Sequence, residues 1–259
     1  MRYLRSTGAC EIMKPTVFLA CAAALAAIAG CNSNQGNAAT GAAATVKVSP
    51  PRNGDWTTIV VPTAAGGFLM GNPNAKVKLI EYGSLTCPHC REFDETGVTP
   101  LINGYVKPGK VAYEFRNYVR DGFDLTASLI ARCNGAKSFF PLARALYKDQ
   151  PTWVGKVQKV PPAQIEALQN LPPNKEFIEL AKVMGLQQYA AMRGVPIAKS
   201  TQCLANSNSV NQLVQMTSDA TTQFPDFPGT PTFIINGKML DRVASWKDLE
   251  GKLKSALGG

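Results

Sequence analysis

The chain has 259 residues, of which 45% are hydrophobic and 17% charged, so it is long enough for one domain, or one domain with a large insertion, around a sizeable core. The formal net charge is +9, but Lys and Arg are scattered and no basic run is interleaved with aromatic residues. This pattern favours a solvated basic surface over nucleic-acid binding and leaves a weak attraction to anionic membranes open.

The first 30 residues are typical of an export signal. An apolar run extends from Val17 to Gly30 after Met13 and Lys14, and Met13 makes a better start than Met1. The run is shorter than the ~20 residues that span a bilayer and has the length of a signal-peptide core. We therefore expect residues 1–30 to be a removed signal peptide.

A lipid-attachment motif ends that segment. Small residues precede a cysteine in Ile28-Ala29-Gly30-Cys31, which resembles a bacterial lipobox. In such signals the chain is cut before the cysteine, and a diacylglycerol is attached to its sulfur. The alternative is an ordinary signal peptide with a chance cysteine. We expect Cys31 to be lipidated and the protein to be a periplasmic, membrane-anchored lipoprotein of the cell envelope.

Composition divides the rest of the chain into four parts. Residues 32–45 are almost all Asn, Ala, Gly, Gln, Ser and Thr, which bury little apolar surface and are typical of a flexible tether. A long stretch later in the chain lacks strand patterns and contains several helical ones. The expected parts are the lipidated Cys and tether at 31–55, the first half of an α/β core at 56–122, an inserted helical domain at 123–223 and the second half of the core at 224–259.

The first half of the core has a strand–helix–strand pattern. Short apolar and β-branched runs predict strands at Trp56–Val61, Lys76–Tyr82 and Val111–Tyr118. A helix is expected to begin at the motif Cys87-Pro88-His89-Cys90 and to extend through Phe93. This order predicts a parallel pair of strands joined by a right-handed crossover.

The remaining elements are mostly helical. Caps and periodicity predict helices at Leu125–Cys133 (capped by Asp124), Phe139–Tyr147, Ala163–Gln169, Lys175–Met184, Ile197–Leu204 and Val210–Thr222. The sheet then resumes at Pro231–Ile235. Asn236-Gly237 predicts a tight hairpin to Lys238–Leu240. A closing helix, Trp246–Leu257, is capped by Ser245.

Seven cysteines divide into three groups. Cys10 and Cys21 lie in the segment expected to be removed, and Cys31 is expected to carry lipid. The remaining four are an even number in an exported protein, which favours two disulfides. We expect a redox-active pair in the Cys-x-x-Cys motif and a structural, redox-inert bond between Cys133 and Cys203. Two buried free cysteines are the alternative for that second pair.

The chemistry of the chain centres on Cys87 and Cys90. A thiolate is the attacking species in disulfide exchange, and a helix N-terminus stabilises it through unpaired N–H groups and the helix dipole. Cys87 lies at the expected helix start and Cys90 one turn later, which lets the two sulfurs form a small disulfide ring. We therefore assign Cys87 as the nucleophile and Cys90 as the resolving thiol.

The residues between the two cysteines support this assignment. His89 is the only histidine in the chain, and an imidazolium between the cysteines favours a Cys87 thiolate and makes the disulfide more oxidising. A solvated surface histidine is the alternative. Structural zinc usually needs four Cys or His ligands, and Cys133 and Cys203 lack a paired spacing, so no metal is expected.

Two segments resemble a known family. The run from Glu81 to Cys90, Glu-Tyr-Gly-Ser-Leu-Thr-Cys-Pro-His-Cys, is similar to the active-site segment of the DsbA-like branch of the thioredoxin superfamily. Gly229-Thr230-Pro231-Thr232-Phe233 resembles the cis-proline loop of that branch. The resemblance covers about Trp56 to Leu257. It implies an α/β protein with a thioredoxin fold, an inserted helical domain and exchange activity without a cofactor.

Three further residues acquire roles from the resemblance. Pro231 matches the cis-proline that faces the active-site disulfide, and Pro88 is part of the active-site motif. The Thr230 backbone would pair with a substrate segment by β-augmentation. Glu81 matches a buried acid that would relay the proton of Cys90, although a solvent-facing strand residue is an equal alternative.

The expected function is disulfide oxidation in exported proteins. Thr230 precedes the cis-proline where the best-known member has Val, and Thr there is also seen in isomerases, so an isomerase or reductase is the alternative. Residues 32–55 are too short and polar for the dimerisation domain usual in isomerases, which favours a monomer. The expected partners are reduced exported proteins, a redox protein that resets Cys87/Cys90, and the membrane. In a third, different class, the motif is a static disulfide or metal clip of a non-catalytic lipoprotein.

Overall fold

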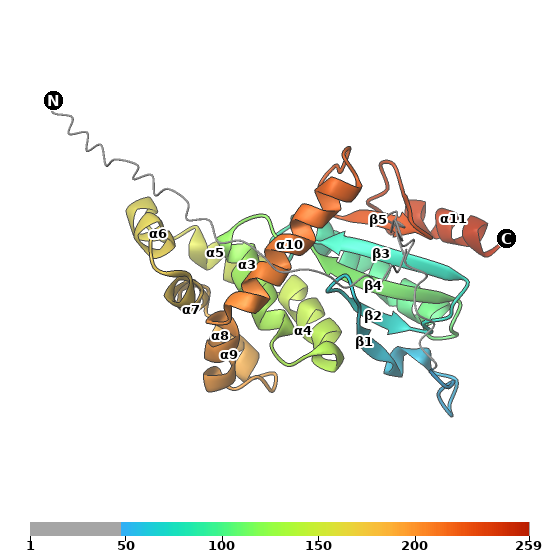
Figure 1. The fold of residues 1–259 in the computed structure, drawn as a ribbon, viewed down its shortest axis with the longest axis horizontal. Helices are drawn as coiled ribbons and strands as arrows, with labels where there is room; N and C mark the ends of the chain where they lie inside the picture. The colour runs from blue at the N-terminus through green and yellow to red at the C-terminus, as the bar shows by residue number, and fades with distance from the viewer. Residues whose placement is uncertain (1–47, 259) are drawn as a thin grey trace, which may run out of the picture. The chain divides into compact units, whose positions relative to one another are not determined.

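The computed structural model describes residues 48–258 (Figure 1). The predicted signal peptide, Cys31 and most of the tether lie outside these residues. Within residues 48–258, no helix combines the length and the apolar character needed to cross a bilayer.

A mixed sheet forms the centre of the fold. Its strands lie in the order β1-β2-β4-β3-β5-β6, with β3 and β4 in the middle. The bounds are β1 Val60–Pro62, β2 Phe68–Gly71, β3 Val77–Gly83, β4 Val111–Asn117, β5 Thr232–Ile235 and β6 Lys238–Met239. β3 and β4 run parallel, and their register pairs Val77 with Val111 and Gly83 with Asn117. The predicted parallel pair is therefore confirmed.

A continuous helical run connects β3 to β4. It consists of α1 (Pro88–Phe93), a π-helical turn at Asp94–Val98, α2 (Thr99–Leu101) and a second π-helical turn at Ile102–Val106. Every boundary residue between these pieces keeps right-handed helical dihedral angles. Cys87 and Cys90 therefore lie at the end of the run that adjoins the carboxyl end of β3.

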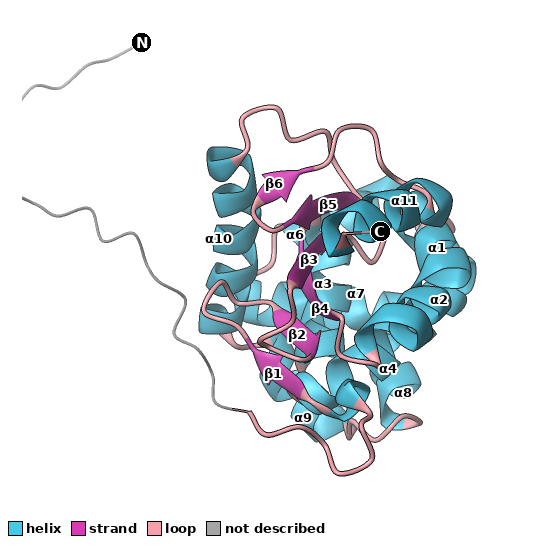
Figure 2. Ribbon diagram, turned by 90° about the vertical axis from the view of Figure 1, so that its right-hand side faces the viewer, coloured by secondary structure: helices cyan, strands magenta, loops and turns pink. Residues whose placement is uncertain are grey.

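Alternation along β3 assigns side chains to the two faces of the sheet. Leu79 packs into the large core with the helical run and α11 (Trp246–Leu257). Tyr82 lies in a smaller cluster with Ala220 of α10 (Ser207–Gln223). Figure 2 shows α1, α2 and α11 on one side of the sheet and α10 on the other. Since side chains alternate along a strand, Glu81 lies on the face that carries Leu79.

The segment between β4 and β5 is helical, as expected. Its helices are α3 Gly122–Arg132, α4 Ala136–Lys148, α5 Gln150–Val157, α6 Pro162–Gln169, α7 Pro173–Met184, α8 Leu186–Ala191, α9 Ile197–Leu204 and α10 Ser207–Gln223. The sequence did not predict α5 and α8. The cap of α3 is Asp121 rather than Asp124, since the Asp121 side chain accepts the Asp124 N–H.

The first half of the core differs from the expectation in two places. Trp56–Thr58 is a 3-10 turn rather than the start of a strand, because the Asp55 side chain accepts the Thr57 N–H at 3.0 Å and caps it. The strand β2 was missed. Its buried residues follow a glycine turn and pair with β4, which lies some 40 residues later in the chain.

The second half of the core follows its local signals. Asn236 and Gly237 adopt positive φ angles of 49° and 84°, as a tight two-residue hairpin requires. β5 and β6 pair antiparallel across that turn. Ser245 caps α11 by accepting the Asp248 N–H. These three features match the sequence-based expectation.

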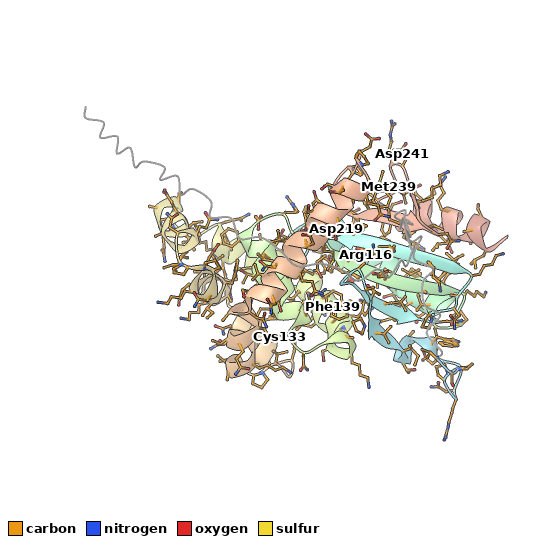
Figure 3. All side chains as sticks on the ribbon, viewed as in Figure 1. Arg116, Cys133, Phe139, Asp219, Met239 and Asp241 are labelled. Atoms are coloured by element: carbon orange, nitrogen blue, oxygen red, sulfur yellow. A yellow bond between two sulfur atoms is a disulfide. The ribbon has the colours of Figure 1, made fainter. Side chains whose placement is uncertain are left out.

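A disulfide joins two helices of the inserted block. Sγ of Cys133, just after α3, is 1.98 Å from Sγ of Cys203 in α9, and the two residues are 70 positions apart. Figure 3 shows Cys133 in the helical block, away from the end of the sheet that carries Met239. The bond fixes the first helix of the block to its penultimate one.

Candidate active site

Cys87 lies where β3 gives way to a helix. It is the N-cap residue of α1, in an extended conformation, and Pro88 follows at the first helical position. Proline suits that position because the N–H it lacks would have no partner inside the helix. The Cys87 backbone N–H donates to the carbonyl of Ser84 at 3.1 Å, which closes the turn before the helix. The sulfur is thereby held at the positive end of α1.

The surroundings of Cys87 favour its thiolate. The pKa of Cys87 is lowered to about 5, first by a hydrogen bond from the Cys90 thiol, with further bonds from the Thr230 side chain and the backbone N–H groups of Cys90 and His89. Burial opposes this shift. In the thiol form, Sγ of Cys87 instead donates to the Thr230 carbonyl at 3.2 Å. A thiol with a pKa of about 5 is mostly ionised at neutral pH, and the thiolate is the form that disulfide exchange requires.

Cys90 has the opposite character. Its side chain is fully buried, and burial together with the hydrogen bond to Cys87 raises its pKa well above the ordinary value. The nearby charge of Glu81 acts in the same direction. Both Cys87 and Cys90 are free thiols in this structure. The pair therefore combines one stabilised thiolate with one protonated, protected thiol.

Glu81 is a buried acid. Only 1% of its surface is exposed, and Oε2 accepts a hydrogen bond from the Tyr113 hydroxyl at 2.5 Å. Burial raises the pKa of Glu81 to about 8, although the Tyr113 bond acts in the opposite direction. The alternative of a solvent-facing strand residue is therefore wrong. A neutral, buried carboxyl with a pKa near that of a thiol is suited to exchanging a proton with Cys90.

The Glu81 proton makes a testable contribution to stability. The folded protein holds it between pH about 4.5 and about 8, whereas the unfolded chain releases it. The free energy of unfolding should fall across that window as pH rises, by up to ~1.4 kcal/mol per pH unit for this group. Glu81→Gln still accepts from Tyr113 and should reduce this slope, as measured by denaturant unfolding at several pH values. An unchanged slope would contradict a raised pKa at Glu81.

Two other buried acids belong to the same pH window. Burial raises the pKa of Asp94 to about 6 and that of Asp124 to about 7. Both remain in the Glu81→Gln variant. We therefore expect the variant to keep part of the decline in unfolding free energy with rising pH. The difference in slope between the wild-type protein and the variant is the contribution of Glu81.

The loop before β5 faces Cys87. The Thr230–Pro231 peptide bond is cis, and the Thr230 carbonyl contacts the sulfur of Cys87. The Thr232 hydroxyl donates to the Gly229 carbonyl at 2.6 Å and fixes the turn. Two segments more than 140 residues apart in the chain therefore meet at the sulfur.

A small pocket adjoins this contact. Its volume is about 210 Å³, and its lining includes His89 from α1, Pro231 from the cis-proline loop, and Leu240 and Val243 from the segment before α11. The His89 side chain is 73% exposed, and its Nδ1 lies 3.6 Å from a Glu92 carboxylate oxygen. The pocket is therefore bordered by the same loop whose Thr230 carbonyl contacts Cys87.

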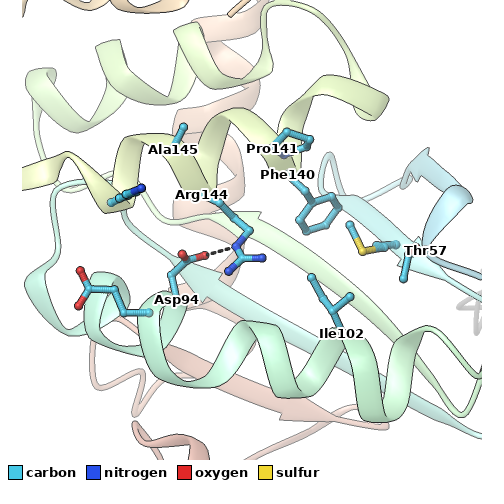
Figure 4. A pocket seen from close by; sticks show the side chains of 10 residues that line it. Thr57, Asp94, Ile102, Phe140, Pro141, Arg144 and Ala145 are labelled. Atoms are coloured by element: carbon cyan, nitrogen blue, oxygen red, sulfur yellow. Dashed lines mark ion pairs between the residues drawn. The ribbon is translucent and has the colours of Figure 1, made fainter.

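A larger cavity lies between α4 and the helical run that follows α1. It measures about 840 Å³, and Asp94, Ile102, Phe140 and Arg144 are among its lining residues. Figure 4 shows the ion pair inside it, in which Nε of Arg144 lies 3.4 Å from Oδ1 of Asp94. None of these lining residues was expected from the sequence to belong to a site. Asp94 follows Cys90 by four positions, and residues four apart lie on the same face of a helix. This spacing is the signal in the sequence that could have linked Asp94 to Cys90.

The cysteine, histidine and carboxylate side chains do not gather as a metal site in the part of the chain that is described. Residues 48–258 hold no group of three or more such side chains placed to bind one ion.

Comparisons with known proteins agree with this geometry. A protein of Rickettsia prowazekii named "putative protein-disulfide oxidoreductase" is 29% identical over 171 residues, which are 66% of this chain and 54% of that protein. The chain thus spans about half the length of the curated relatives it matches. A crystal structure described as a protein-disulfide isomerase from Novosphingobium aromaticivorans is 34% identical, with a TM-score of 0.70 over 74% of this chain and 97% of that one.

The fold recurs in more distant proteins. Alpha-DsbA1 of Wolbachia pipientis is 21% identical, with a TM-score of 0.60 over 76% of this chain and 94% of that one. The predicted α/β class, a thioredoxin fold with an inserted helical domain, is thereby confirmed. The family model described as thioredoxin matches residues 63–255. The chain belongs to the thioredoxin family.

Proposed function

We propose that this chain is a thiol:disulfide oxidoreductase that introduces disulfide bonds into exported proteins through Cys87 and Cys90. The observation that carries the proposal is the asymmetry of the pair: the pKa of Cys87 is lowered to about 5, while that of buried Cys90 is raised. A stabilised Cys87 thiolate favours the reduced form, which makes the Cys87–Cys90 disulfide an oxidant.

The proposed reaction is two successive exchanges. A substrate thiolate attacks Sγ of Cys87 in the oxidised enzyme, the Cys87–Cys90 bond breaks, and Cys90 leaves as a thiolate that takes a proton through Glu81. A second substrate thiolate then attacks the substrate sulfur of the mixed disulfide and releases Cys87 as its stabilised thiolate. The substrate loses two electrons and the enzyme gains them, so a separate redox protein must reoxidise the pair.

The Thr230 backbone supports a mode of substrate binding. β5 begins only at Thr232, so the segment at Thr230 and cis-Pro231 precedes the paired strand and faces Cys87. An extended peptide can align there by β-augmentation, with a side chain in the 210 Å³ pocket.

An isomerase or reductase of the same fold is the second candidate. It is favoured by Thr230 before the cis-proline and by the structural relative described as a protein-disulfide isomerase. The test compares two substrates: a reduced protein that needs disulfides and the same protein with scrambled ones. An oxidase regenerates the first with its own oxidised pair. Faster recovery of the scrambled substrate by the reduced enzyme would contradict the oxidase assignment, and no activity on either would favour the static clip.

His89 should tune the strength of the oxidant. Protonated imidazole beside Cys87 stabilises the thiolate of the reduced form. We expect His89→Ser to make the Cys87–Cys90 disulfide less oxidising by about tenfold in its equilibrium constant with glutathione, or ~30 mV. An unchanged or more oxidising potential would mean that only the His89 backbone N–H contributes.

Cys31 should anchor the protein to a membrane. The lipobox-like segment at Ile28–Cys31 motivates this proposal. Mass spectrometry of the native membrane fraction should find a diacylglycerol on Cys31 and no residues 1–30. Cys31→Ala should remain uncleaved or leave the membrane, and a normal mature form on the membrane would contradict the anchor.

We further propose that the enzyme is a monomer and that it acts on the periplasmic side of the envelope.

We also propose a division of the mature chain that matches these roles. The tether covers residues 31–55. The two halves of the thioredoxin core cover residues 56–122 and 224–259, and they carry the cysteines and the cis-proline loop. The helical insertion covers residues 123–223.

A further inference from the structure

The inserted helical block contacts the segment that leads into Cys87. The Gln150 side chain donates from Nε2 to the carbonyl of Leu85 at 2.8 Å and to that of Cys87 at 3.0 Å. The Tyr147 hydroxyl donates to the carbonyl of Ser84 at 3.2 Å. Gln150 and Tyr147 are buried. The carbonyls of three of the four residues from Ser84 to Cys87 therefore receive a hydrogen bond from one corner of the helical block.

That corner is rigid. α4 ends at Lys148, α5 begins at Gln150, and Asp149 is the cap residue of both. Trp153 is buried, and its Nε1 donates to the Leu146 carbonyl at 2.8 Å, which joins the two helices. The Gln150 carboxamide is consequently fixed relative to α4, which packs against the helical run that follows Cys90.

The Gln150 hydrogen bonds determine the orientation of peptide groups next to the sulfur. The Cys87 carbonyl also accepts the Arg91 N–H at 3.2 Å as the first turn of α1 forms. Without Gln150, the Leu85 carbonyl would lose its hydrogen bond and the Cys87 carbonyl would keep only the bond from the Arg91 N–H. A buried carbonyl without its full set of partners is unfavourable. We expect the Leu85–Cys87 segment to rotate so that its carbonyls find other hydrogen-bond donors. Such a rotation moves Sγ of Cys87 away from the N–H groups at the start of α1.

We propose that Gln150 is a positioning residue, which holds Leu85–Cys87 so that Sγ of Cys87 meets the N-terminus of α1 and the Thr230 loop. The inserted helical block thereby helps to set the reactivity of the core cysteine. This inference rests on the proposed exchange function of Cys87. It assigns to the block a role in the chemistry that is additional to covering the core.

The test compares two glutamines of the same block. Gln150→Met preserves the length and volume of the side chain and removes both donors. Gln187→Met is the matched control, because Gln187 is also buried and its Nε2 donates to Ser200 and Thr201 at 3.3 and 2.8 Å, away from Cys87. The measurements on the full chain are the thiolate absorbance titration of Cys87, the glutathione redox equilibrium and the melting temperature.

We expect Gln150→Met to raise the pKa of Cys87 by about one unit and to shift the redox equilibrium about tenfold toward a weaker oxidant. Gln187→Met should lower the melting temperature without moving either quantity. An unchanged Cys87 pKa in Gln150→Met, or equal shifts in both variants, would overturn the inference.

Two further results keep the test decisive. If Gln150→Met does not fold, Gln150→Asn replaces it. Asn keeps the carboxamide, but its side chain is one methylene group shorter, so the amide no longer reaches the two carbonyls. The same three measurements are then compared with those of the Gln187 control. If the wild-type protein itself shows an ordinary Cys87 thiol and no exchange, the proposed function fails. A wild type that exchanges, with Gln150 variants that titrate like it, refutes only the positioning role.

Discussion

Cys87→Ser should reduce disulfide exchange to the uncatalysed rate. Cys87 is the thiol whose pKa is lowered and the one that contacts the cis-proline loop, whereas Cys90 is fully buried behind it. A serine hydroxyl at position 87 cannot form a mixed disulfide, so the first exchange is lost. The measurement is the rate at which a reduced model protein acquires disulfides.

Cys90→Ser is the matched variant and should behave differently. Without Cys90 the enzyme has no disulfide of its own to donate, so it should not oxidise a reduced substrate. Its Cys87 thiolate can still attack the disulfide of an oxidised substrate, and because no Cys90 thiol can then release Cys87, the mixed disulfide should accumulate. Non-reducing gels and mass spectrometry detect them. Mixed disulfides that persist in Cys87→Ser, or form through Cys90, would reverse the assignment of nucleophile and resolving thiol.

Loss of the Cys133–Cys203 disulfide should lower the free energy of unfolding more than any other substitution proposed here. The bond closes a loop of 70 residues between the end of α3 and α9. In the chain-entropy account, removing such a cross-link costs roughly 4 kcal/mol of unfolding free energy, and measured values often fall short of it. We expect Cys133→Ala with Cys203→Ala to lower the melting temperature while Cys87 keeps its exchange chemistry.

Selective alkylation tests the same bond directly. Mild reduction of the oxidised, folded protein should release two thiols, from Cys87 and Cys90, and denaturing reduction should release two more. Neither Cys133 nor Cys203 lies at a helix N-terminus, and the other two cysteines of the described residues, Cys87 and Cys90, contact each other. Four equally reactive thiols, or labelling of Cys133 without reductant, would show that the bond is not inert.

Local signals explain what could be predicted from the sequence. The Asn236-Gly237 turn, the Ser245 cap and the helix start at Cys87 each depend on a few consecutive residues. The elements around them were therefore anticipated closely. The resemblance to a known family placed Pro231 opposite Cys87, where the structure has a cis peptide bond and a contact from the Thr230 carbonyl.

Long-range contacts explain what was missed. β2 (Phe68–Gly71) has no alternating pattern, and its strand character comes from pairing with β4. Gln150 lies outside every element predicted from the sequence, yet its side chain reaches the Leu85 and Cys87 carbonyls more than 60 residues away. No property of residue 150 alone indicates that contact.

The buried acids show an intermediate case. Glu81 matched a family position, but only the structure establishes its 1% exposure and its bond to Tyr113. Asp124 has an acceptable local pattern for a helix cap, yet its carboxylate accepts the Leu85 and Arg120 N–H groups instead. Tertiary partners, which no local pattern specifies, decided both outcomes.

Cys87 and Cys90 should behave as one redox-active pair when the protein is titrated with glutathione and its alkylated thiols are identified by mass spectrometry. We expect two thiols to appear together, at Cys87 and Cys90, at a potential well above the about −300 mV below which structural disulfides usually lie. A Cys87–Cys90 bond that resists reduction to that potential, or thiols at 87 and 90 that titrate independently, would rule out a single redox pair.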